Sequence, residues 1–387
     1  MWVGFVFWTL GLVALVVALD AARRILVKRA PSLPQQQHTA LILPCRGVDP
    51  EFPAFLDALA RQSLPDYRLY FVVADPNDDA VPLIRDFRTK HAGLAELVVY
   101  PQPPGYSGKI ANMLGGVEAT TTYDYTYLIF LDSDTIPDPE FAAQLISPLV
   151  RNEAMLTTGA RVLIPQEETL PQWVASLWLL SSLPGVARPQ MGSAWGGAMA
   201  IRGEDARRLD VARIWEGAFS DDHTLSHAVR EDGGRIAFVP HCLTPIPIHY
   251  NWSDLVDFLV RQLVTIRVHD FRLWMLTWMM VYPLLLLLVG LSQTLGGQYL
   301  WAGLTISALL PLVFAYYLAN EAVWKRLRLP AIHFRKRPIV QQAGAFAALI
   351  LIHPYVMVRS ALLRNFTWRG QEYIVRNGKI TKVSGTQ

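Results

Sequence analysis

The stretch YLIFLDSDTIPDPEF, residues 127–141, joins an apolar run to a cluster of carboxylates. If residues 127–131 form a strand, side chains alternate across it, so Asp132 and Asp134 project toward the same side. Two carboxylates on one side suit a divalent cation and, through it, a diphosphate. Asp, Ser, Thr and Pro are also ordinary turn residues. The motif alone therefore leaves a turn and a metal site open.

Around this stretch, apolar runs that end in turn residues alternate with segments of helical spacing. The runs TALILPCRG (39–47) and YRLYFVVADPNDD (67–79) are typical of buried strands. Their alternation with helices predicts an α/β fold with a doubly wound, mostly parallel sheet. Ligands of such sheets bind beyond the carboxyl ends of the strands, where Arg46, Asp75 and Asp132 fall. This convergence favours a binding site over a plain turn.

The composition indicates a membrane protein. Of 387 residues, 52% are hydrophobic and only 17% are charged, which exceeds the apolar content of ordinary soluble enzymes. The excess lies in four runs, residues 2–19, 273–295, 299–320 and 340–358. The first run has no basic region before it and no small-residue cleavage site, so it predicts an anchor and not a cleaved signal peptide.

Basic residues predict the topology. They follow the first run directly and crowd the loop at 325–337, so both regions are expected in the cytoplasm. If the run at 340–358 spans the membrane, the basic tail at 364–387 lies outside, against this charge rule. A re-entrant run removes the conflict, and both arrangements remain open.

We therefore expect an integral membrane protein of a bacterial-type inner or plasma membrane. Its expected parts are an N-terminal anchor (1–22), a cytoplasmic catalytic domain (38–270), a C-terminal membrane region (271–363) and a basic tail (364–387).

Several functional classes are disfavoured. The net charge is only +3, and the basic residues flank membrane runs, which fits lipid contact and not nucleic-acid binding. No phosphate-binding P-loop, dinucleotide fingerprint or nucleophile elbow occurs. The two cysteines, in a region assigned to the cytoplasm, are expected to be reduced thiols, and no Cys/His spacing indicates zinc.

The order of motifs resembles that of a known family. LILPCRG, VVADPNDD, YSGKIANML, FLDSDTIPDPEF, GGAMAIRGE, FSDDHTL and RQLVTIR follow one another as in the membrane-bound glycosyltransferases of family 2 and their ceramide glucosyltransferase relatives. The resemblance covers residues 40–270, and WRGQEYIV (368–375) is similar to a closing motif of these lipid-directed enzymes. It implies a GT-A fold, a nucleotide-sugar donor, with a UDP-sugar expected, and Mg²⁺ or Mn²⁺ as cofactor.

The resemblance also implies roles for the acidic residues. Asp134 and Asp132 are the expected metal ligands, with Asp134 the more direct one. Asp222 is the expected general base that deprotonates the acceptor hydroxyl, and Asp221 is expected beside the donor. The alternative for the acidic pair is a helix cap, since Ser220 and Asp221 both cap well.

Further donor contacts follow from the same resemblance. Asp75 is expected to bind the nucleobase. Lys109, at the start of a predicted helix, opposes the helix dipole, and a bound phosphate would explain its place. The complete set expected to bind the nucleotide sugar is Pro44, Arg46, Asp75, Lys109, Asn112, Asp132, Gly196, Gly197, Asp221, Arg261, Gln262 and Arg267.

The segment RQLVTIR, residues 261–267, departs from the family's Q-x-x-R-W pattern. Thr265 and Ile266 stand where Arg and Trp are expected. The departure weakens a role in holding a polymer, and an interfacial basic helix is the alternative.

These observations predict an inverting glycosyltransferase that acts on a membrane lipid at the cytoplasmic face. A processive polysaccharide synthase is the enzymatic alternative, and a transporter or an inactive membrane scaffold is the alternative from another class.

Overall fold

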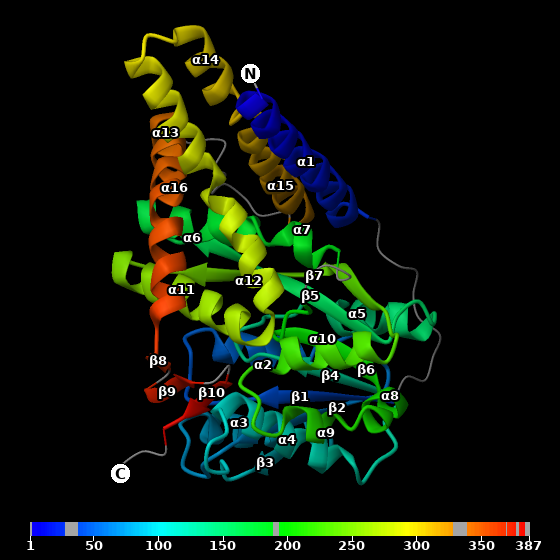
Figure 1. The fold of residues 1–387 in the computed structure, drawn as a ribbon. Coiled ribbons are helices and arrows are strands. Elements are labelled where there is room, and N and C mark those ends of the chain that lie inside the picture. Colours follow the sequence, from blue (N-terminus) through cyan, green and yellow to red (C-terminus); the bar gives the residue numbers. More distant parts are fainter. Residues whose placement is uncertain are drawn as a thin grey trace. The chain divides into compact units, whose positions relative to one another are not determined.

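The computed structural model describes residues 2–27, 38–188, 193–327, 339–368, 370–376 and 379–383. These residues form two compact units, each assembled from segments far apart in the sequence (Figure 1). The sheet unit comprises the described residues of Lys28–Arg161, Arg188–Ile246 and Arg364–Gln387, and the helical unit those of Met1–Val27, Val162–Ala187 and Pro247–Leu363.

A seven-stranded mixed sheet has the order β3-β2-β1-β4-β6-β5-β7. Its first four members run parallel to one another, whereas β6 is antiparallel to both β4 and β5. The strands are β1 (Thr39–Pro44), β2 (Tyr67–Val73), β3 (Ala95–Val99), β4 (Tyr127–Leu131), β5 (Leu156–Pro165), β6 (Ala198–Arg202) and β7 (Ile236–Ile248). The predicted α/β class with a mostly parallel sheet is confirmed.

Both faces of this sheet are covered by helices, which explains why β1 and β4 are buried at every position. Leu41 and Leu43 face a core shared with α2, α3 and α5, whereas Ala40 and Ile42 face a core shared with α4, α9 and α10. The helices of the sheet unit are α2 (Phe52–Leu59), α3 (Ala80–Lys90), α4 (Gly108–Thr120), α5 (Phe141–Val150), α8 (Gly203–Arg208), α9 (Val211–Trp215) and α10 (Asp221–Glu231).

The last part of the chain forms a second, three-stranded antiparallel sheet of order β10-β9-β8. Its strands are β8 (Asn365–Trp368), β9 (Gln371–Arg376) and β10 (Lys379–Lys382). The sequence prediction gave this region only as a basic tail. Strands of four to six residues are too short to be distinguished from a tail by composition.

The helical unit contains α1 (Trp2–Ile25), α6 (Leu170–Leu180), α7 (Leu183–Val186), α11 (Trp252–His269), α12 (Phe271–Thr277), the 3₁₀ turn η1 (Trp278–Val281), α13 (Tyr282–Leu295), α14 (Tyr299–Ser307), α15 (Leu310–Leu327) and α16 (Ile339–Leu362). Among the residues that the structure describes, three segments are long and apolar enough to cross a membrane: Phe271–Leu295, Tyr299–Leu327 and Val340–Leu362. They overlap three of the four predicted runs. The remaining run, the predicted anchor at 2–19, falls within α1, which lies along α15 (Figure 1).

The last apolar run is one continuous helix of 24 residues, even though Pro354 lies inside it. At 1.5 Å per residue, such a helix is long enough to cross the hydrocarbon core. A buried contact fixes it within the helical unit: the indole Nε1 of Trp178 donates to His353 Nδ1 at 3.2 Å, and His353 Nε2 lies 3.0 Å from the carbonyl oxygen of Thr277. The predicted basic loop at 325–337 lies mostly outside the described residues.

Helix α4 packs unusually close to the large sheet because it presents glycines to it. A Cβ on Gly116 would lie 2.3 Å from Cγ2 of Ile42, in the middle of β1. The close approach sets the position of the whole helix, and with it the position of the residues at its amino end.

We predict that Gly116→Ala lowers the free energy of unfolding by about 1–3 kcal/mol, because the added methyl group overpacks a filled core. Gly185→Ala is the matched control, since a Cβ there would meet nothing within 4 Å. Denaturant unfolding of the purified variants measures the difference. Equal stability of the two variants would contradict the close packing of α4.

Candidate active site

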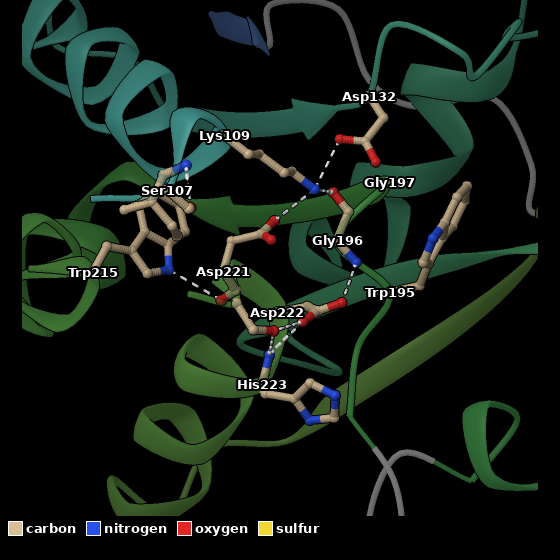
Figure 2. Close-up of polar contacts among 12 residues, drawn as sticks. Ser107, Lys109, Asp132, Trp195, Gly196, Gly197, Trp215, Asp221, Asp222 and His223 are labelled. Atoms are coloured by element: carbon tan, nitrogen blue, oxygen red, sulfur yellow. Dashed lines mark hydrogen bonds and ion pairs between the residues drawn. The ribbon is translucent and has the colours of Figure 1, made fainter. Parts of the chain in front are cut away.

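The centre of the candidate site is the ammonium group of Lys109, which lies between two carboxylates (Figure 2). Its Nζ is 2.8 Å from Asp132 Oδ1 and 3.1 Å from Asp221 Oδ2. It also donates to the carbonyl oxygen of Gly196 at 3.1 Å. Four separate segments of the sheet unit, namely α4, the loop after β4, the segment before β6 and the start of α10, therefore meet at one cation.

Local sequence places Lys109 there. Ser107 caps α4, with its Oγ accepting from the backbone N–H of Ile110 at 3.3 Å, so Lys109 is fixed in the first turn. A cation in the first turn is unfavourable for the helix dipole. The neighbouring carboxylates compensate for this cost.

Gly196 and Gly197, two of the predicted donor contacts, also have a structural role at this point. The N–H of Gly196 donates to Asp222 Oδ2 at 2.9 Å, while a Cβ on Gly196 would lie 2.5 Å from Asp221 Oδ2. The carbonyl oxygen of Gly197 accepts from the N–H of Asp132 at 3.1 Å. Only glycine at position 196 leaves room for the Asp221 carboxylate.

The acidic pair begins α10, and the two carboxylates point in different directions (Figure 2). Asp221 is directed at Lys109, and its own carbonyl oxygen accepts from the indole Nε1 of Trp215 at 3.0 Å. Asp222 accepts from the hydroxyl of Ser220 and from the N–H of His223, the latter at 2.7 Å. Ser220 is also the N-cap of the helix, so the capping alternative holds for Ser220 while both aspartates stay available.

The two aspartates differ in their acidity. Burial raises the pKa of Asp221 to about 7, with the charges of Asp222 and Asp132 adding to the effect and Lys109 opposing it. Burial also acts on Asp222, but His223, Lys109 and the hydrogen bonds from Ser220 and Gly196 outweigh it and lower the pKa of Asp222 to about 2. Burial disfavours the charged form of Lys109, yet the surrounding carboxylates raise its pKa. A pair of carboxylates with separated pKa values is typical of acid–base sites.

Asp132 and Asp134 lie just after β4, in a turn in which the N–H of Thr135 donates to the carbonyl oxygen of Asp132 at 3.1 Å. The motif is thus a turn, and a turn does not prevent it from binding a metal ion. Within the described parts of the chain, no group of three or more His, Cys, Asp or Glu side chains is arranged to hold a metal ion. Two carboxylates remain a suitable oxygen donor set for Mg²⁺ or Mn²⁺ if a ligand supplies further oxygens.

Other predicted donor contacts lie at the same edge of the sheet. Pro44 ends β1, and the carbonyl oxygen of Cys45 next to it accepts from Asn112 Nδ2 of α4 at 3.0 Å. Arg46 Nη1 lies 3.7 Å from the position that a Cβ would take on Gly108. Asp75 is exposed after β2, where its Oδ1 accepts from the N–H of Asn77 at 2.8 Å.

Arg261, Gln262 and Arg267 belong to α11 of the helical unit. Arg267 donates to the carbonyl oxygens of Ala361 and Leu363, the latter at 3.3 Å. Its guanidinium thus secures the end of α16. The donor-binding role of these three residues stays a prediction.

Sequence reasoning missed two residues that shape the site, Ser107 and Trp215. Ser107 directly precedes a predicted helix, and its hydroxyl accepts from the N–H three residues later, so the capping pattern could have identified it. Trp215 is fully buried and packs edge-on against Phe130 at 5.1 Å. No local pattern indicates its hydrogen bond to Asp221.

Acidic residues at the carboxyl edge of a mostly parallel α/β sheet are the arrangement that the resemblance to family 2 glycosyltransferases predicts. The sequence matches the family described as glycosyl transferase family 21 over residues 4–381, which is nearly the whole chain. The chain belongs to this family. No curated protein matches the sequence significantly.

Solved structures with similar folds include two enzymes. The mannosyltransferase PcManGT from Pyrobaculum calidifontis, in complex with GDP-Man and Mn²⁺, is 15% identical, with 93% of this chain and 96% of that chain covered and a TM-score of 0.48. The glucosyl-3-phosphoglycerate synthase from Mycobacterium tuberculosis, in complex with phosphoglyceric acid, is 19% identical, with 60% and 80% covered and a TM-score of 0.39.

The raised pKa of Asp221 predicts a pH dependence of stability. Because this carboxyl binds its proton more tightly in the folded protein, its contribution is complete below about pH 4 and is lost as the pH rises through about 7. In metal-free buffer, the wild-type protein should therefore lose more thermal stability between about pH 5 and pH 8 than Asp221→Asn does. Thermal unfolding at several pH values measures this, and equal slopes for the two proteins would contradict the raised pKa.

Proposed function

We propose that the protein transfers a sugar, with inversion, from a nucleotide sugar to the hydroxyl group of a membrane lipid. The observation that carries the proposal is the convergence of Asp132, Asp221 and Asp222 around Lys109. A UDP-sugar is the expected donor, and the cytoplasmic face is the expected side of the membrane.

The donor diphosphate would bind at the amino end of α4, beside Lys109. Arg46 lies at the same end of the helix, and burial together with the charge of Arg46 lowers the pKa of Lys382. Lys109 and Arg46 thus place two positive charges at the amino end of α4, and positive charge at a helix N-terminus favours the binding of an anion there. Asp75, at the end of β2, would contact the nucleobase. Asn112 and Pro44 would line the pocket between the nucleobase and the diphosphate. Gly196 and Gly197 would border the sugar.

A divalent cation would be held by Asp134 and Asp132 together with diphosphate oxygens. When bound, such an ion neutralises the charge that develops on the departing nucleoside diphosphate. Asp132 Oδ1 also pairs with Lys109 Nζ, so the lysine balances part of the charge of this carboxylate.

The proposed base is Asp222. Its low pKa keeps it ionised near pH 7, and it would take the proton of the acceptor hydroxyl as the hydroxyl oxygen attacks the anomeric carbon. A new glycosidic bond forms, the bond from the anomeric carbon to the phosphate oxygen breaks, and the nucleoside diphosphate departs. One base without a second nucleophile implies inversion. Asp221 is the alternative base, because its pKa of about 7 matches proton transfer near neutral pH.

The lipid acceptor is proposed from architecture. Three segments of the helical unit are apolar and long enough to cross a membrane, which suits an acceptor presented by the bilayer. The resemblance to ceramide glucosyltransferases supports the same acceptor class. The absence of the Arg-Trp pair in residues 261–267 disfavours a processive polysaccharide synthase, and the family membership disfavours a transporter or scaffold.

Asp134→Ala is expected to abolish metal-dependent donor binding, because the cation loses its main protein ligand. Glu140→Ala removes a carboxylate from the same loop and serves as the control. Calorimetric titration of UDP-sugars with and without Mn²⁺ measures the effect. If Asp134→Ala still binds donor in a Mn²⁺-dependent manner, Asp134 is not the ligand.

Asp222→Asn is expected to keep donor binding and to lower the transfer rate by about 10²–10⁴-fold, because the base is lost while its hydrogen bonds are largely kept. Glu231→Gln, at the exposed end of the same helix, should leave the rate unchanged. Initial rates of sugar transfer to lipid measure both. If Asp222→Asn turns over at the wild-type rate, Asp222 is not the base. The base would then be Asp221, and Asp221→Asn should be inactive.

A further inference from the structure

The three strands at the end of the chain make a small sheet with two different faces. Burial alternates along β9, where Tyr373 is 1% exposed and Val375 is 5% exposed, whereas Ile374 between them is 41% exposed. This is the period of two expected for a sheet with one covered face. The covered face carries three aromatic rings, those of Phe366, Trp368 and Tyr373.

These three rings enclose Phe219 of the sheet unit. The ring centroid of Phe219 lies 5.1 Å from that of Tyr373, 5.8 Å from that of Phe366 and 5.9 Å from that of Trp368, each in an edge-on arrangement. Edge-on pairs at such distances are the favourable geometry for aromatic rings. We call this group of four rings the aromatic clamp.

Phe219 is 9% exposed and contacts all three rings of the small sheet. It directly precedes Ser220, the N-cap of α10, and the two aspartates of the site follow at once. A movement of Phe219 would therefore be passed to Asp221 and Asp222, because only Ser220 separates Phe219 from this acidic pair.

The same small sheet also contacts the segment before α4. Lys382 Nζ donates to Gln102 Oε1 at 3.0 Å, and Gln371 Nε2 donates to the same oxygen at 3.2 Å. Gln102 in turn donates through Nε2 to the carbonyl oxygen of Tyr106, next to the cap of α4. The small sheet thus contacts Phe219, which precedes α10, and Gln102, which precedes α4. Both helices carry residues of the cluster around Lys109.

We propose that the aromatic clamp is a positioning element of the transferase site, which fixes the start of α10 so that its carboxylates face the reacting groups. The proposal rests on the function proposed above for Asp221 and Asp222. The ring of Tyr373 carries the effect because it contacts Phe219 most closely and stacks on Phe366 at 5.4 Å. Its hydroxyl group donates to Gln371 Oε1 at 2.9 Å and also has a hydrogen bond with the backbone of Gly108, the first residue of α4.

The test compares three variants of the full-length protein in lipid nanodiscs. Tyr373→Leu removes the ring, Tyr373→Phe keeps the ring and removes the hydroxyl, and Ile374→Ala changes the exposed face of the same strand. Deuterium exchange of the peptide covering residues 218–225 reports the order of the start of α10, with the peptide of α3 as the internal reference. Transfer of label from UDP-glucose, UDP-galactose and UDP-N-acetylglucosamine into extractable lipid reports turnover.

For Tyr373→Leu we expect exchange at residues 218–225 to become about tenfold faster, with α3 unchanged. Turnover should fall by about 10- to 100-fold, because small displacements of catalytic groups are costly, while the donor KM changes by less than about threefold. Ile374→Ala should resemble the wild-type protein in all three measurements, and Tyr373→Phe, which keeps the ring, should resemble it in exchange at residues 218–225.

Unchanged exchange at residues 218–225 in Tyr373→Leu would overturn the clamp. Faster exchange with unchanged turnover, in a preparation whose wild-type protein is active, would overturn its role in the reaction. Faster exchange in a preparation whose wild-type protein transfers no sugar would instead uphold the clamp and contradict the function proposed for the site.

Discussion

The ion pairs of Lys109 are the constraint on which the rest of the site depends. One ammonium group holds the carboxylate that follows β4 and the first carboxylate of α10, and it also bonds to the backbone of Gly196. A buried charge is costly unless it is paired and hydrogen-bonded. Three segments separated by many residues in the sequence must therefore stay together, because separating any of them would leave a charge unpaired.

This constraint explains features that look unrelated in the sequence. The glycine at position 196 is needed because the Asp221 carboxylate occupies the place of its Cβ. The glycine at position 116 lets α4 approach β1 closely enough to carry Lys109 to the carboxyl edge of the sheet. The separated acidities of Asp221 and Asp222 follow from the same crowding, since one faces the lysine while the other accepts hydrogen bonds. Packing and chemistry are thus set by one cluster.

Much of the sheet and its carboxylates could be predicted because their signals are local. Alternating runs identify the strands, a turn motif marks Asp132, and a capping serine precedes Asp221. The clamp could not be predicted, because Phe219 and Tyr373 are far apart in the sequence and their strands are short. The contact of Trp215 with Asp221, six residues apart, escaped prediction for a different reason, since a buried tryptophan gives no sign of its hydrogen-bond partner.

The central claim is that the cluster around Lys109 transfers one sugar to a lipid. The most direct test gives the purified protein in lipid a panel of radiolabelled UDP-sugars with Mg²⁺ or Mn²⁺. The account predicts label in a lipid-extractable product that carries a single sugar, with its formation lost when the cation is chelated. Label in a water-soluble or insoluble polymer, or no label with any donor, would contradict the account.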